Sequence, residues 1–256
     1  MPELERLMLH KLAELDAMVR RAVDTHDWTG VYPVAHQFCN TDLSAFYFDI
    51  RKDALYCDVK LDEDGRQLRQ SETRRACRTV LDILHRCLTT WLAPVLPFTA
   101  DEAWRARFGE AACVHLERFV TVPDDWYDKE IAEKWGVIQD KRNKALLRLE
   151  KLRMCGTIKS SLQASAVLYL DREDQSLLRP KEWEDVLIVS HVSFEPDLPA
   201  PINDDGSVDS EWIAGSRILV EIAPGAKCAR CWKVLPEVGE TPAHPGLCRR
   251  CCDYVE

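Results

Sequence analysis

The sequence lacks the features of a membrane or exported protein. No apolar stretch approaches the length needed to span a bilayer, and the first residues, MPELERLMLHKL, carry charges among their apolar side chains. A secretory signal requires an uninterrupted apolar segment, so this start argues against one. Eleven cysteines without an export signal are typical of a reducing compartment. We therefore expect a cytoplasmic monomer with no membrane partner, whose cysteines outside any metal site are free.

The chain also lacks an excess of positive charge and the common catalytic motifs. Its 34 Lys and Arg residues face 43 Asp and Glu residues, for a net charge of -9, so a nucleic-acid surface would have to be a local basic patch. No P-loop, GxGxxG motif or Ser/His/Asp constellation occurs, and there are no repeats. Three acids, Asp49, Asp53 and Asp58, lie close in sequence, but ordinary helix and loop positions explain them. We assign no catalytic residue.

Helical periodicity dominates the first 155 residues. Apolar residues recur every three or four positions over residues 2–27, and SETRRACRTVLDILHRCLTTWLA forms a long helix that stops before Pro94. Thr99 followed by Glu102 predicts a capping box that opens the next helix. The polar residues 60–70 have the composition of a loop. The aromatic stripe in FYFDIRKDALY is better explained as bundle core than as a stacking platform, and Arg51 and Lys52 favour the negative end of its helix.

β-rich runs follow this helical part. They are ASAVLYL, VLIVSHVSF and RILVEIA, separated by a short helical piece around Trp183 and by an Asp/Pro/Gly loop. The predicted fold class is mainly α, with a helical bundle over residues 1–155, a small α/β module over 156–223 and a zinc ribbon over 224–256.

The ribbon is predicted from the cysteines of the tail, KCARCWKVLPEVGETPAHPGLCRRCCDYVE. Two C-x-x-C pairs, Cys228/Cys231 and Cys248/Cys251, lie sixteen residues apart, a spacing that suits a tetrahedral metal site. The segment between them cannot form its own core, so a metal would organise it. Four thiolates leave no open coordination position, which predicts one structural zinc. Cys252 could replace Cys251, and His244 could replace a sulfur, but the C-x2-C spacing favours Cys251.

Two parts of the chain are candidates for RNA contact. In the tail, Trp232 could stack on a base while Arg249 and Arg250 pair with phosphates, or the indole could pack beneath the metal site while the arginines are merely solvated. The segment KRNKALLRLEKLR inverts the local charge, with Lys141, Arg142 and Lys144 among six cations against one acid, which suits phosphate contact.

Together these stretches resemble the C-terminal part of bacterial isoleucyl-tRNA synthetases. MLHKLAELD, FCNTDLSAFYFDIRKDALYCD, RRACRTVLDILHRCLTTWLAPVLPFTADEAW, IKSSLQA and KCARCW…LCRRC follow one another in that family's order. FYFDIRKDALY and LAPVLPFTADEAW are shared in outline with the valine and leucine enzymes, and the cysteine tail favours isoleucine.

The resemblance implies an anticodon-binding helical domain and a zinc ribbon that helps to engage the tRNA. It implies Cys228, Cys231, Cys248 and Cys251 as the zinc ligands, isoleucine tRNA as the partner, and RNA contacts at Trp232 and along the basic helix. Unpaired anticodon bases suit recognition by stacking and by their edges.

The HIGH and KMSKS-like signatures of a full synthetase are missing. We therefore expect no activation of isoleucine by this chain alone, and ATP and isoleucine would enter only through a separate catalytic domain or chain. The alternatives are a fragment, a split-gene product, or a catalytically silent zinc-ribbon interaction protein left by a decayed gene. A DNA-repair protein, which can carry a similar ribbon, fits the helical bundle poorly.

Overall fold

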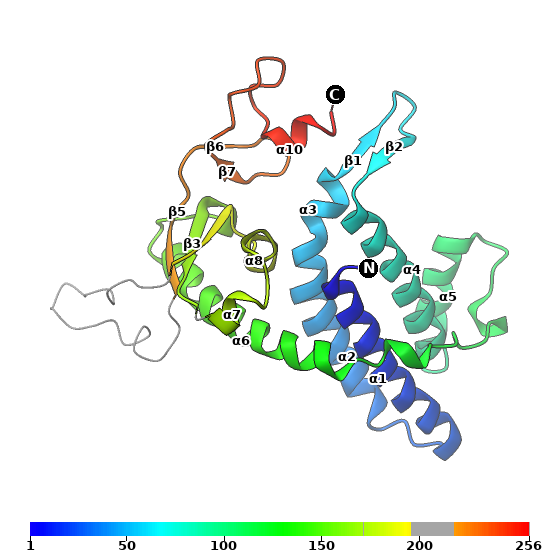
Figure 1. Ribbon diagram of the computed structural model, residues 1–256. Helices are drawn as coiled ribbons and strands as arrows, with labels where there is room; N and C mark the ends of the chain where they lie inside the picture. The colour runs from blue at the N-terminus through cyan, green and yellow to red at the C-terminus, as the bar shows by residue number, and fades with distance from the viewer. Residues whose placement is uncertain (171, 196–217, 256) are drawn as a thin grey trace. The chain divides into compact units, whose positions relative to one another are not determined.

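The computed structural model describes residues 1–170, 172–195 and 218–255 (Figure 1). Two compact units divide the chain. The first, here called the helical unit, comprises residues 1–49 and 70–132, and the second comprises residues 50–69 and 133–256. The units therefore do not follow the order of the sequence, and the predicted three-domain division stays a prediction. Among the described residues, no helix is long and apolar enough to cross a membrane.

The helical unit is built around its first helix, α1 (Glu3–Thr25). The apolar stripe predicted from the sequence is buried, and α1 contacts both α2 (Val31–Gln37) and α4 (Glu72–Leu92). From α2 the chain continues without a break into the π-helix η1 (Phe38–Phe48). Phe46 and Tyr47 of the aromatic stripe are buried, as is the preceding Leu43, so the interpretation as core is confirmed for these residues, whereas Tyr56 at the end of the stripe is 76% exposed.

Helix α4 begins after Ser71, whose side chain accepts a hydrogen bond from the Arg74 backbone N–H. The next helix, α5 (Pro97–Phe108), contacts α4 and begins two residues before Thr99. The predicted capping box is therefore wrong, because Pro97 already supplies the helical φ angle at the first position. Short 3-10 turns at Val114–Leu116 and Asp124–Trp126 follow.

The second unit joins a segment from the middle of the chain to its C-terminal part. Helix α3 (Asp49–Cys57) leads into a hairpin of β1 (Val59–Leu61) and β2 (Gln67–Gln70), where a loop was expected. The tight turn explains the difference: the Asp62 carboxylate accepts a hydrogen bond from the Arg66 N–H, the Asp62 N–H donates to the Arg66 carbonyl, and Gly65 adopts a left-handed φ of 75°. The long basic helix is α6 (Lys129–Met154).

A three-stranded sheet forms the α/β module, in the order β4–β3–β5; its strands β3 and β5 are labelled in Figure 1. Strand β3 (Ala164–Leu168) pairs in parallel with β4 (His191–Phe194) and antiparallel with β5 (Ile218–Ile222). The parallel connection runs through the short α7 (Arg172–Gln175) and through α8 (Pro180–Leu187), which is the helical piece expected around Trp183.

The run VLIVSHVSF forms a strand only in its second half, since its first residues end α8. Ile188 takes a left-handed φ of 56° there and closes the helix. Most of the predicted Asp/Pro/Gly loop lies outside the described residues.

The ribbon begins with a two-stranded sheet of β6 (Ala226–Lys227) and β7 (Val234–Leu235) and ends in one helical turn, α10 (Arg249–Cys252). Gly225 precedes β6 with a φ of 112°, and a Cβ there would lie 2.3 Å from the Leu235 backbone carbon. Only glycine fits where these two segments of the ribbon backbone pass each other so closely. The fold is thus mainly α, with small sheets and a cysteine-containing ribbon.

Candidate metal centre and nucleic-acid interface

Four cysteine sulfurs meet in the ribbon. The Sγ atoms of Cys228, Cys231, Cys248 and Cys251 lie within 4.8 Å of one another, and all four residues are buried. The Sγ atoms of Cys231 and Cys248 are 3.7 Å apart. A tetrahedral ion with metal–sulfur bonds of about 2.3 Å would place its sulfurs roughly 3.8 Å apart. The four thiols therefore fit one metal ion.

The ribbon backbone holds two of these sulfurs in position. The Cys228 N–H donates to the Lys233 carbonyl at 2.9 Å, and the Trp232 N–H returns to the Cys228 carbonyl at 3.0 Å, which closes the first C-x-x-C loop. The Cys248 N–H donates to the Cys228 sulfur at 3.3 Å, so the second loop bonds directly to the first. The geometry selects Cys251 from the two alternatives for the fourth sulfur. Within the described residues, neither Cys252 nor His244 belongs to the four-sulfur group.

One of the four thiols is prepared for ionisation by its neighbours. Burial opposes a charge on Cys228, but backbone hydrogen bonds from Cys231, Cys248 and Arg230 outweigh it and lower the pKa of this thiol to about 7. The hydrogen bond with Cys248 raises the pKa of Cys231 to about 12. The hydrogen bond with Cys231 lowers the pKa of Cys248, but the hydrogen bond with Cys251 and burial outweigh it and raise this pKa to about 11. A zinc ligand must be a thiolate, so Cys228 is the most readily ionised of the four, and a bound metal would displace the protons of the others. With four sulfur donors and no open position, such a metal would hold the fold and would not do chemistry on a substrate.

Trp232 is presented to solvent by the first loop. The side chain is 60% exposed, so it does not pack beneath the sulfurs. Its φ of 68° is left-handed, a region that bulky residues rarely adopt. The ammonium of Lys227 lies 5.0 Å from the centre of the indole ring. An exposed aromatic ring beside a cation, held in an unfavourable backbone conformation, is a candidate stacking surface.

The two arginines of the second loop are both paired within the protein. Arg249 is exposed and its guanidinium lies 2.5 Å from Glu240. Arg250 is half-buried, binds both carboxylate oxygens of Asp53 and lies 3.4 Å from Asp58. Burial opposes ionisation of Asp53, but the hydrogen bond and charge of Arg250 outweigh it and lower the pKa of this carboxyl. Arg250 therefore has a structural partner in α3.

Some of the positive side chains of the basic helix point toward other residues of the protein. Arg142 is buried and its Nε donates to the Val186 carbonyl at 3.0 Å, while Lys141 pairs with Asp174. Lys144, which is part-exposed, lies 2.9 Å from Asp140 one turn earlier. The positive charge of this helix was predicted from the sequence. The inward orientation of Lys141 and Arg142 was not predicted, because residue type alone does not tell which face of a helix is covered.

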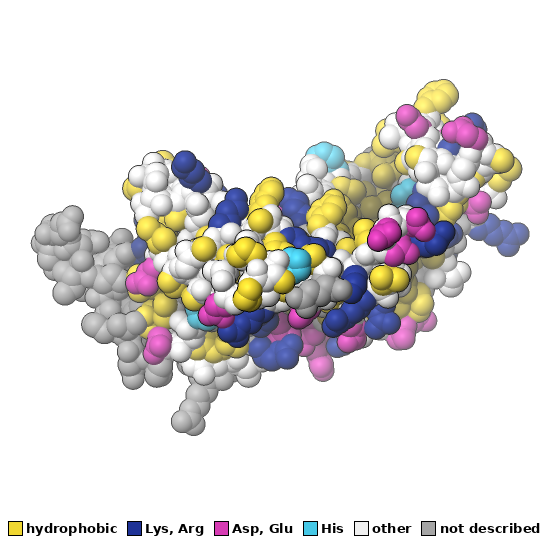
Figure 2. Space-filling model, turned by 90° about the horizontal axis from the view of Figure 1, so that it is seen from above, with side chains coloured by type: hydrophobic (Ala, Val, Ile, Leu, Met, Phe, Trp, Pro, Cys, Tyr) yellow, Lys and Arg dark blue, Asp and Glu magenta, His cyan; other side chains and the backbone are white. Residues whose placement is uncertain are grey.

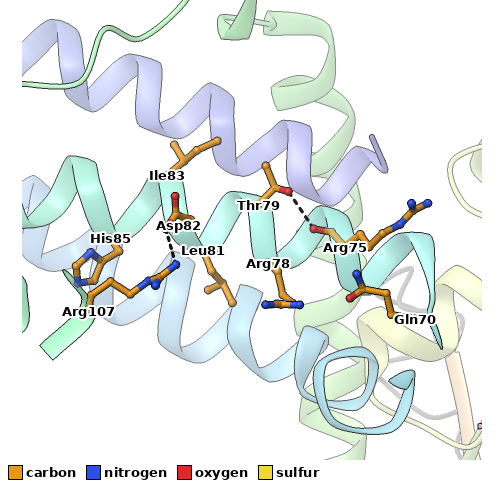
Figure 3. A pocket seen from close by; sticks show the side chains of 9 residues that line it. All are labelled: Gln70, Arg75, Arg78, Thr79, Leu81, Asp82, Ile83, His85 and Arg107. Carbon is orange, nitrogen blue, oxygen red and sulfur yellow. Dashed lines mark hydrogen bonds and ion pairs between the residues drawn. The ribbon is translucent and has the colours of Figure 1, made fainter. Parts of the chain in front are cut away.

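The helical unit contains an arginine-lined hollow that the sequence reasoning missed. Its volume is about 880 Å³, and Figure 3 shows its lining from successive turns of α4 together with Gln70 at the end of β2 and Arg107 of α5. Arg107 pairs with Asp82 at 3.0 Å across this hollow, while Arg75 is exposed at its edge. A signal was available, since Arg75 and Arg78 stand three residues apart in SETRRACRTV and so share one face of a helix.

No single-sign field of charge dominates the face seen in Figure 2. Lys and Arg side chains lie there among Asp, Glu and apolar side chains. This mixture agrees with the net charge of -9 and favours local contacts over long-range attraction as the way to bind an anion.

Comparison with known proteins identifies the family of this chain. Residues 5–168 match the protein family described as "Anticodon-binding domain of tRNA ligase". An isoleucine–tRNA ligase of Gluconobacter oxydans is 51% identical over 255 residues, which cover all of this chain but 24% of that protein. The corresponding ligases of Ruegeria pomeroyi and Zymomonas mobilis are 42% and 38% identical over 98% and 100% of this chain. The chain thus spans about a quarter of the length of these curated relatives. It belongs to the family of anticodon-binding domains of tRNA ligases.

Proposed function

We propose that this chain binds the anticodon arm of isoleucine tRNA as part of isoleucyl-tRNA aminoacylation, and that one structural zinc ion holds its ribbon in the binding conformation. The anticodon-binding domain supports tRNA as the partner, and the relatives named isoleucine–tRNA ligase support the choice of tRNA. This chain alone is not a catalyst in the proposal, because it carries no signature of an ATP site.

The observation that carries the proposal is the exposed indole of Trp232. A base of the anticodon loop, which is unpaired, would stack on this ring, with Lys227 placed for a neighbouring phosphate. Lys144 and Arg249, whose ion pairs with Asp140 and Glu240 are more exposed than that of Lys141, would add phosphate contacts. In the helical unit, the exposed Arg75 is a separate candidate for a phosphate contact. Arg142 and Arg250 are bonded to Val186 and Asp53, and Lys141 is paired with Asp174, so they contribute by shaping the surface.

The left-handed backbone at Trp232 offers a clean test of stacking against structure. Glycine is at ease at a φ of 68°, so Trp232→Gly should keep the metal and relax the backbone while it removes the ring. Loss of stacking should weaken RNA binding by roughly 1–3 kcal/mol, with little change in the salt dependence. Trp232→Phe, which keeps an aromatic face, should retain part of the affinity.

The charged contacts should respond differently. Lys144→Ala and Arg75→Ala should each lower the steepness of the salt dependence by about one unit, because each removes one phosphate contact. The measurement is a titration of the chain with isoleucine tRNA at several salt concentrations, with metal content determined for every variant. Equal affinity for an unrelated tRNA would contradict recognition and would favour a silent interaction protein.

A further inference from the structure

A fifth thiol, Cys57 at the end of α3, lies against the four-sulfur group. It is 6% exposed and is buried together with Cys228, Cys231, Cys248 and Cys251. In the metal-free chain the Cys251 thiol is the donor of a side-chain hydrogen bond to the Cys57 sulfur, which lowers the pKa of Cys57. The C-x-x-C spacing could not indicate this neighbour, since Cys57 precedes Cys228 by about 170 residues.

The two cysteine loops reach the same part of α3. In each C-x-x-C pair the residue before the second cysteine is an arginine, Arg230 in the first and Arg250 in the second. The Arg230 guanidinium donates to the backbone carbonyls of Cys57 at 3.1 Å and Val59 at 2.8 Å. The Cys57 carbonyl ends α3, where the helix itself provides no donors, and the Val59 carbonyl follows two residues later in β1. Arg250 binds Asp53 one turn earlier.

The single proton of the Cys57 thiol is donated to the Arg230 carbonyl at 3.6 Å, and the Asp53 carboxylate is a second acceptor within reach. The Cys251 sulfur becomes a third acceptor once a metal has replaced its own proton. Both oxygens of Asp53 already accept from Arg250. A thiolate that holds a metal is an anion, and a hydrogen bond to an anion is stronger than one to a neutral carbonyl. With a metal in the ribbon, Cys251 is therefore the best acceptor.

We propose that Cys57 is an outer-sphere positioning residue of the metal centre, whose thiol donates a hydrogen bond to the Cys251 thiolate and so couples metal retention to the end of α3. The inference rests on the proposed metal and does not depend on RNA binding. Groups that bond to metal ligands in this way orient the ligand and strengthen the site. The metal thereby also stabilises residues 53–59, although they lie far from the ribbon in sequence.

The first test is metal retention by the full chain. Wild type, Cys57→Ala and Cys57→Ser are loaded with zinc and titrated with a chromophoric chelator, with Cys87→Ala of α4 as the control for loss of a buried thiol elsewhere. Cys57→Ala should hold zinc about 10- to 100-fold more weakly. Cys57→Ser should recover part of this loss because its hydroxyl still donates, and Cys87→Ala should match wild type.

The second test separates an outer-sphere role from direct ligation. With cobalt in place of zinc, Cys57→Ala should keep the sulfur-to-cobalt charge-transfer intensity of wild type, because all four ligands remain. Hydrogen exchange should show faster exchange of residues 53–59 when zinc is removed. Zinc retention by Cys57→Ala equal to that of Cys87→Ala would overturn the proposal, and so would a cobalt spectrum that lacks one sulfur. A wild-type chain that binds no metal would instead overturn the proposed metal itself.

Discussion

The helical unit and the ribbon have interiors of different composition, which are stabilised in different ways. The helical unit buries long apolar side chains such as Leu7, Met8, Leu12 and Val80, each at most 2% exposed. The ribbon buries four sulfurs together with Cys57, and in the part of the chain that the structure describes the partly buried apolar residues packed against them are Leu235, Val238 and Leu247. A core of the first kind stabilises itself by burial, whereas clustered thiols with so little apolar surface need an ion. The two regions should therefore fail under different conditions.

The largest difference is expected on removal of the metal. The purified chain should contain about one zinc, and Cys228→Ser or a strong chelator should remove it. Structural zinc contributes about 10 kcal/mol or more to small domains of this kind, so residues 226–252 should lose their protection from hydrogen exchange. The helical unit should keep its protection. A ribbon that stays ordered without metal, or zinc retained by Cys228→Ser, would remove the distinction between the two regions.

The opposite change is expected from a cavity in the helical core. Leu12 of α1 is completely buried, and Leu12→Ala should destabilise the helical unit by about 2–5 kcal/mol in denaturant unfolding. Metal content should not change, because Leu12 and the four cysteines belong to different compact units. Loss of zinc in this variant would show that the two regions unfold as one.

A single methyl group should disturb the ribbon. Gly225→Ala places a Cβ 2.3 Å from the Leu235 backbone at a φ of 112°, so it should cost more than about 1 kcal/mol and weaken metal retention. Gly246→Ala is the matched control in the same ribbon, since its Cβ would meet only the Ala229 side chain at 3.9 Å. Equal metal retention in the two variants would contradict the close crossing at Gly225.

The smallest effect is expected from a surface ion pair of the helical unit. Burial opposes ionisation of Asp82, but the hydrogen bonds and charges of Arg86 and Arg107 outweigh it and lower the pKa of this carboxyl. Because the folded pKa lies below the unfolded one, the stabilisation is present above the unfolded value of about 3.9 and is lost as the pH falls through the folded value. Asp82→Asn should thus be slightly less stable than wild type at neutral pH, and the difference should shrink below about pH 4. A difference that persists in acid would exclude the ion pairs as its cause.

Periodicity and residue spacing in the sequence alone determined the main helices of this protein and the composition of its four-sulfur group. The apolar stripes of α1 and α4 predicted helices because every third or fourth side chain must face the core. The two C-x-x-C pairs predicted the four sulfurs because a two-residue gap is a local constraint that any fold must respect. These signals are short in range, and a linear sequence contains them completely.

Tertiary packing decided what lies beside these elements. The fifth thiol at Cys57, the pairing of Arg250 with Asp53 and the burial of Arg142 against Val186 join residues that are distant in sequence. The 60% exposure of Trp232 was equally undecided by residue type, since an indole suits a core as well as a surface. The physical reason is that side-chain chemistry specifies which contacts are favourable, while the path of the backbone decides which of them can form.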